Sequence, residues 1–99
     1  MRDEIALQRD VTRAGKAKAL LENELLKEAF STLEASYLKA WRETSARDVE
    51  AREAYFRAVN QLAKVQEHLQ TVVSNGSVAQ ADLNKLHAEA DRRKRFGII

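Results

Sequence analysis

Residues 26–48, which read LKEAFSTLEASYLKAWRETSARD, decide the fold of this chain. Large apolar side chains recur there at steps of three and four, and such steps place them along one side of a 3.6-residue helix. The positions are Leu26, Phe30, Leu33, Tyr37 and Trp41. The last six residues of the stretch, ETSARD, contain no large apolar side chain. The stretch therefore predicts an amphipathic helix that ends in a short polar turn.

A second apolar stripe with the same helical spacing follows the turn. It consists of Tyr55, Val59, Leu62, Val65, Leu69 and Val72. Ser45 is suited to cap the second helix, and Asp48 three residues later completes a pattern like a capping box. The sequence therefore predicts an all-α fold, an antiparallel helical hairpin with helices over about residues 16–43 and 46–74.

The dipeptide Asn75-Gly76 predicts the end of the second helix, because both residues tolerate the left-handed conformation common at helix C-termini. Ser77 can then cap a short third helix. We expect a single domain over residues 1–99. Its parts are residues 1–15, either flexible or an extension of the first helix, the hairpin over 16–75, the third helix with a basic segment over 77–95, and a hydrophobic tail over 96–99.

Apolar and small residues beside the two stripes predict self-association. Leu21, Leu25 and Ala29 widen the apolar face of the first helix beyond what one neighbouring helix covers. A line of alanines, Ala51, Ala54 and Ala58, allows another helix to approach the second one closely. A chain of 99 residues also leaves a large share of its surface in contact with water. We therefore expect a helical homo-oligomer of the coiled-coil type.

The composition excludes several classes of protein. Hydrophobic residues make up 44% of the chain and charged residues 32%, a balance typical of a folded helical protein and not of a disordered one. Without cysteine the chain forms no disulfide and offers no thiolate to a metal. Its apolar runs fall short of the roughly 18 residues that a membrane span requires, so we expect no membrane partner.

The sequence offers no recognisable catalytic or metal-binding motif. The two histidines, His68 and His87, lack the additional ligands that a metal site requires. The serines lie in no glycine-rich elbow, and the three glycines are too dispersed to form a phosphate-binding loop. We therefore expect a protein that is not an enzyme, with no cofactor, no bound metal and no small-molecule substrate.

The basic residues are clustered, although the net charge is only +2. Four consecutive cations lie near the C-terminus and a looser group lies near the start; they are Arg92, Arg93, Lys94 and Arg95, then Arg9, Arg13, Lys16 and Lys18. Such clusters can neutralise the phosphates of nucleic acid or contact an acidic partner. They are equally suited to keep a protein soluble or to stabilise a helix C-terminus. Because no helix-turn-helix pattern is present, any DNA binding should be weak and tolerant of sequence.

The residues around the turn resemble a group of small proteins encoded in bacteriophage and prophage genomes. The resemblance covers about residues 20–96 and is carried by Leu33 to Trp41, Thr44 to Asp48, Glu50 to Glu53, Val65, His68-Leu69, Val72-Val73, Gly76 and the arginine-rich segment. A proline often occupies the position of Glu24 in that group, so the resemblance implies a more continuous first helix in this chain. It implies a viral setting, in the cytoplasm of a bacterial host or in the virion.

An oligomeric helical hairpin with basic ends is also similar to the oligomerisation core of phage small terminase subunits. Those proteins form rings, engage viral DNA and regulate the large packaging subunit. The resemblance implies a DNA-packaging or assembly protein that binds itself, viral DNA or that large subunit. Residues 1–20 are too short to supply the N-terminal helix-turn-helix of a typical small terminase. Two alternatives remain open: a head-tail or capsid-associated structural component of the virion, and a small helical regulator of a host protein.

Overall fold

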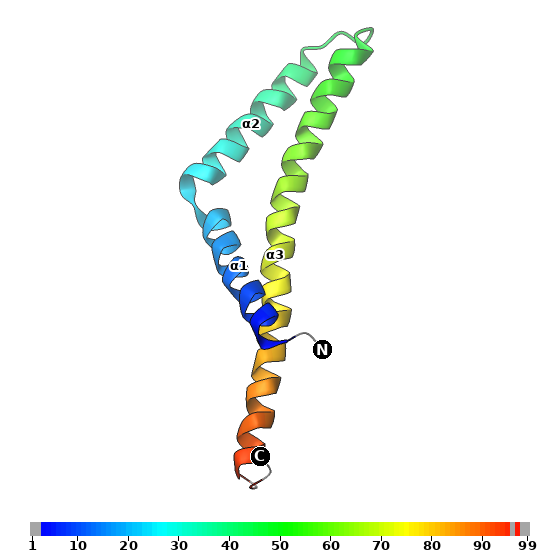
Figure 1. Ribbon diagram of the computed structural model, residues 1–99. Helices are drawn as coiled ribbons and strands as arrows, with labels where there is room; N and C mark the ends of the chain where they lie inside the picture. Colours follow the sequence, from blue (N-terminus) through cyan, green and yellow to red (C-terminus); the bar gives the residue numbers. More distant parts are fainter. Residues whose placement is uncertain (1–2, 96, 98–99) are drawn as a thin grey trace. The chain divides into compact units, whose positions relative to one another are not determined.

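The computed structural model describes residues 3–95 and 97 of the chain. This part of the chain contains three helices and no strand (Figure 1). They are α1 over Glu4–Glu22, α2 over Glu24–Arg42 and α3 over Val49–Arg95. The predicted all-α class is therefore confirmed for the described residues. In the same part of the chain, no helix is both long and apolar enough to span a lipid bilayer.

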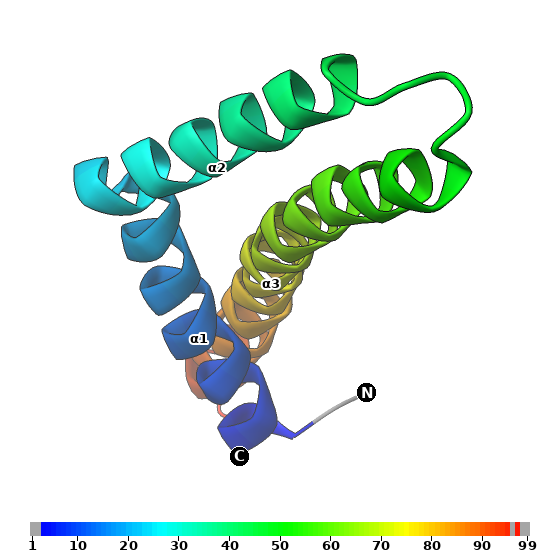
Figure 2. The ribbon, with the colours of Figure 1, turned by 90° about the horizontal axis from the view of Figure 1, so that it is seen from above.

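Backbone contacts divide the chain into two compact units. The terminal unit consists of Met1–Lys18 with Gln70–Ile99, and the central unit is Ala19–Leu69. The terminal unit thus combines most of α1 with the second half of α3. The central unit contains α2, the turn over residues 43–48 and the first part of α3, and Figure 2 shows that turn as the loop joining the two helices.

The fully buried side chains of the described residues lie in the terminal unit. Leu7 of α1 and Ala79 of α3 are both 0% exposed, and Leu83 joins them in one apolar cluster. Val11 and Leu86 pack against this cluster. In this unit α1 and α3 lie side by side (Figure 1). The N-terminal segment, expected to be flexible or an extension of the first helix, is thus a packed helix from Glu4 onward.

The predicted helix end at Asn75-Gly76 is wrong, because α3 runs on through both residues to Arg95. Gly76 is buried against α1, where an added Cβ would overlap the Cβ of Ala14 and lie 3.2 Å from the Asp10 carbonyl oxygen. This glycine thus allows two helices to approach closely and does not terminate one. For the same reason Ser77 caps no helix, and the third helix expected over 77–95 is the second half of α3.

The first long helix, predicted to run from residue 16 to 43 without interruption, is divided at Asn23. Asn23 has an extended backbone, and its Oδ1 accepts a hydrogen bond of 2.9 Å from the Leu26 backbone N–H. Asparagine is among the preferred N-cap residues, so α2 begins at Glu24. The more continuous helix implied by the resemblance is therefore wrong. The first position of a helix is one where proline is well tolerated, so a proline at Glu24 fits the same break.

The polar turn over residues 43–48 is confirmed, since α2 ends at Arg42 and α3 begins at Val49. Its capping residue differs from the prediction. Asp48 Oδ1 accepts a hydrogen bond of 3.1 Å from the Ala51 backbone N–H, whereas Ser45 Oγ accepts one of 3.2 Å from Arg47 within the turn itself. Asp48 is therefore the N-cap, and α3 starts three residues later than the predicted residue 46.

Candidate interaction surfaces

Most residues of the two predicted stripes are half-buried. They are Leu26, Phe30, Tyr37, Tyr55, Val59, Leu62 and Leu69 in the central unit, and Val72 in the terminal unit. The other three are exposed: Leu33 by 43%, Trp41 by 45% and Val65 by 49%. All residues of the central unit are described, and none of them is fully buried. Two helices alone cover only one seam of each apolar face, which leaves the remainder in contact with water.

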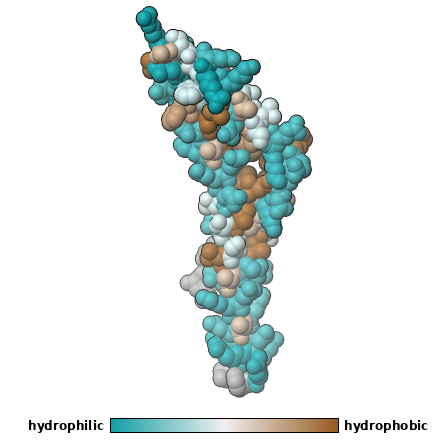
Figure 3. Space-filling view, turned by 180° about the vertical axis from the view of Figure 1, so that it is seen from behind, coloured by the Kyte–Doolittle hydropathy of each residue, from teal (hydrophilic) through white to brown (hydrophobic). Residues whose placement is uncertain are grey.

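An open apolar pocket of about 330 Å³ lies in the central unit beside the turn. Its lining comes from the end of α2 and the start of α3: Leu38, Trp41, Tyr55, Phe56, Val59 and Asn60. Phe56 is 59% exposed, more than Trp41. Figure 3 shows apolar side chains reaching the surface between hydrophilic ones on one face. Contiguous exposed apolar surface of this kind marks interaction sites in soluble proteins.

Arg52 is on the same side of α3 as three of the pocket residues and has a buried donor without a partner among the described residues. It precedes Tyr55, Phe56 and Val59 by three, four and seven residues, so it shares their side of α3. The Nε of Arg52 is buried and has no hydrogen-bond partner within the described part of the chain. Buried donors of this kind are nearly always paired in folded proteins. One guanidinium nitrogen on the pocket's side of α3 is therefore buried without an acceptor among the described residues.

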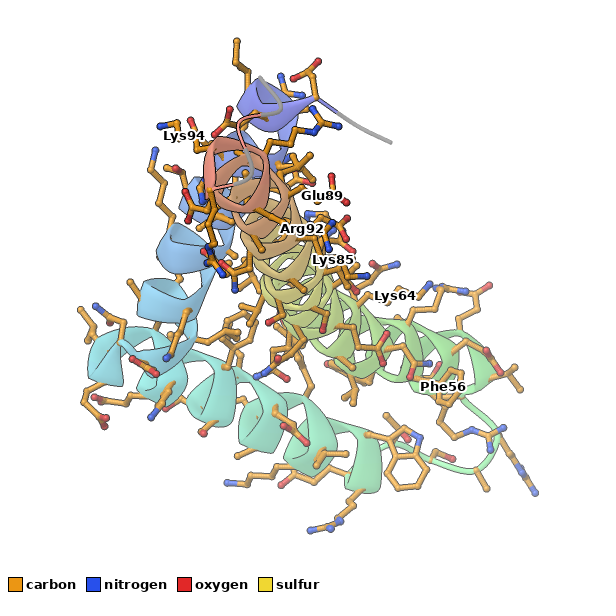
Figure 4. All side chains as sticks on the ribbon, turned by 90° about the horizontal axis from the view of Figure 1, so that it is seen from below. Phe56, Lys64, Lys85, Glu89, Arg92 and Lys94 are labelled. Carbon is orange, nitrogen blue, oxygen red and sulfur yellow. The ribbon has the colours of Figure 1, made fainter. Side chains whose placement is uncertain are left out.

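The four predicted C-terminal cations form the last turn of α3, and all four are exposed. Consecutive helical residues point about 100° apart, and Figure 4 shows Arg92 and Lys94 leaving α3 on different sides. Arg92 and Arg95 share a shallow hollow of about 550 Å³ with Lys85, Ala88 and Glu89. The structure thus gathers three cations, one of them outside the predicted run, around a single carboxylate.

The N-terminal cations Arg9, Arg13, Lys16 and Lys18 lie exposed on α1. The first three are separated by four and three residues and so share one side of the helix. Lys18 lies on another side of α1. The hollow near the end of α3 is lined by residues of α3 alone, so the structure does not join the two basic groups into one site.

The two histidines are placed differently. His87 Nε2 lies 3.1 Å from Glu4 Oε1, which connects α3 to the start of α1 within the terminal unit. His68 is exposed on α3. Across the described residues, nowhere do three His, Asp or Glu side chains gather as metal ligands would.

Comparisons of the chain with protein-family models, with curated proteins and with solved structures found no match. The similarity to phage proteins and to small terminase subunits therefore stays a prediction.

Sequence reasoning named Trp41, Tyr55 and Val59 among the contact residues and did not name Arg52. The available signal was an arginine one helical turn before two consecutive aromatic residues.

Proposed function

We propose that this chain is a non-enzymatic helical assembly protein that associates with itself and binds DNA through the cationic end of α3. One observation supports the assembly most. The central unit has no fully buried side chain, and its aromatic residues Trp41 and Phe56 are exposed where they line an apolar pocket. In this proposal α2 and the first part of α3 act as the helical hairpin, and further copies of the chain cover its exposed apolar side.

Self-association follows from the energetics of apolar surface. Removing such surface from water is favourable by about 25 cal/mol per Å². A small domain that exposes large aromatic and aliphatic side chains gains this free energy when copies assemble, because its own core is too small to cover them. Trp41 and Phe56 are also residue types enriched at protein interfaces.

The DNA-binding part rests on charge. Arg92 and Arg95 face the same hollow as Lys85, and the neighbouring cations Arg93 and Lys94 point to other sides. Such an arrangement contacts phosphates without presenting side chains to base edges in a fixed order. Binding should therefore be weak, insensitive to base sequence and strongly dependent on salt. The same cations could engage an acidic surface of a large packaging subunit.

The biological setting we propose is bacteriophage DNA packaging or virion assembly in the host cytoplasm, with a role like that of a small terminase. This setting rests on the resemblance of residues 20–96 to phage proteins. Retention of the protein in purified virions at fixed stoichiometry would instead favour the structural role, since packaging regulators leave before the particle matures.

Salt-dependent DNA binding tests this function. We expect the variant with Arg92, Arg93, Lys94 and Arg95 changed to alanine to bind duplex DNA more weakly on every sequence. The slope of log K against log salt should fall by about 0.9 for each phosphate that the variant no longer neutralises. A matched control removes four exposed cations elsewhere: Lys39, Arg47, Arg57 and Lys64. Equal losses in both variants, or no retention of the wild type at low salt, would contradict DNA binding by the end of α3.

A further inference from the structure

The hollow near the end of α3 gathers cations along one side of that helix. Its lining includes Lys85, Arg92 and Arg95, and all three side chains are exposed. Lys85 precedes Arg92 by seven residues, which is about two helical turns, so the two side chains project from the same side. Figure 4 shows Lys85, Glu89 and Arg92 together on one side of α3. The cations of the hollow can therefore contact one surface at the same time.

This side of α3 faces away from α1. Lys85 follows Leu83 by two residues, and side chains two residues apart on a helix point in nearly opposite directions. Leu83 belongs to the buried cluster that Leu7 of α1 also joins, so Lys85 points away from that cluster. Within the terminal unit, a partner that approaches the hollow therefore does not have to displace α1.

The other two cations of the last turn continue the side of α3 that packs against α1. Arg93 follows Leu86 by seven residues, and Leu86 packs against the buried cluster. Lys94 follows His87 by the same two turns, and the His87 Nε2 lies 3.1 Å from the Glu4 Oε1 of α1. A chain of phosphates on this side would also approach the Glu4 carboxylate, which repels it. The four consecutive cations are therefore not equivalent toward a single extended anion.

We infer that Lys85, Arg92 and Arg95 form the DNA contact at the end of α3, and that Arg93 and Lys94 take no part in it. This inference rests on the DNA binding proposed above and specifies its residues. The line from Lys85 to Arg95 is about 15 Å long, at 1.5 Å per residue. Each strand of a duplex carries one phosphate per about 3.4 Å of its axis, so a line of this length meets enough phosphates for all three cations.

Glu89 weakens this contact, because it is the one carboxylate among the described residues that line the hollow. It follows Lys85 by four residues and precedes Arg92 by three, so it neighbours both on the helix surface. A carboxylate in this position competes with phosphate for the cations and also repels it. Removal of its charge should therefore strengthen binding, which is the opposite of the effect expected at Lys85.

Alanine substitutions in matched pairs test the inference, with binding to a duplex of mixed sequence measured as a function of salt. Lys85→Ala and Lys94→Ala each remove one exposed lysine of α3, so they change the net charge equally. We expect Lys85→Ala to weaken binding about tenfold at ~50 mM salt and to lower the slope of log K against log salt by about 0.9. Lys94→Ala should leave both nearly unchanged. Arg92→Ala and Arg93→Ala should differ in the same way.

Charge removal at the carboxylate gives a second measurement of opposite sign. Glu89→Gln should strengthen binding severalfold, whereas Glu53→Gln, at an exposed position in the first part of α3, should not. All these substitutions change exposed side chains, so the helical content should stay that of the wild type. Equal losses within each matched pair would overturn the inference, because total charge and not the side of α3 would then decide binding. Absence of DNA binding by the wild type at low salt would instead overturn the proposed function.

Discussion

Gly76 and Gly15 are two helical glycines with opposite surroundings, and they show what single residues decide in this fold. A Cβ at Gly76 would overlap the Cβ of Ala14, whereas a Cβ at Gly15 would meet nothing within 4 Å. Glycine in a helix is less favourable than alanine by about 1 kcal/mol, so only close packing justifies it. That reason exists at Gly76 and is absent at Gly15.

We predict that Gly76→Ala destabilises the protein, because α1 must move away from α3 and the strain of overpacking, about 1–3 kcal/mol, outweighs the gain in helix propensity. Gly15→Ala should stabilise it by up to about 1 kcal/mol. Urea denaturation of the two variants measures both free energies of unfolding. An equal stabilisation by both substitutions would show that α1 does not pack against Gly76.

Arg52 is the other residue whose surroundings appear only in the structure. From the sequence it is one of many charged residues on a helix, and charged residues usually face solvent. Its Nε is buried and has no hydrogen-bond partner among the described residues, and helical periodicity alone does not encode that burial. The apolar stripes, by contrast, were predictable because helical periodicity is a local property of the sequence.

At the level of elements, helix ends depend on a few polar side chains. The sequence correctly predicted the turn between residues 43 and 48, because six residues without a large apolar side chain interrupt both stripes. It misplaced two other boundaries. Asn23 caps a helix within a stretch of strong helix formers, and Asn75-Gly76 continues one despite its turn-like composition. The deciding factor at Gly76 is the contact with α1, which lies about sixty residues away in the sequence.

The start of α3 provides a test of the observed capping. We expect Asp48→Ala to lower the free energy of unfolding by about 1 kcal/mol, because the Ala51 backbone N–H loses its acceptor. Ser45→Ala, which removes only a hydrogen bond within the turn, should change it by less than about 0.5 kcal/mol. Thermal unfolding of both variants gives the comparison. A larger loss with Ser45→Ala would restore Ser45 as the cap.

For the whole molecule, the distribution of buried residues bears on the proposed assembly. Leu7, Ala79 and Leu83 form a small core in the terminal unit, while the central unit leaves Trp41 and Phe56 exposed. Exposed aromatic surface of this kind is what association between copies would remove from water. The sequence indicated the surplus of apolar residues but not where it lies, because that depends on which faces α1 and α2 cover.

The molecular mass in solution tests the proposed self-association most directly. One chain has a mass of 11.2 kDa. We predict that sedimentation equilibrium gives a multiple of this mass at micromolar to millimolar concentrations, and that the mass falls toward that of one chain on dilution. A mass of 11.2 kDa at every concentration would contradict the proposal and leave the exposed apolar pocket of the central unit without the partner assigned to it.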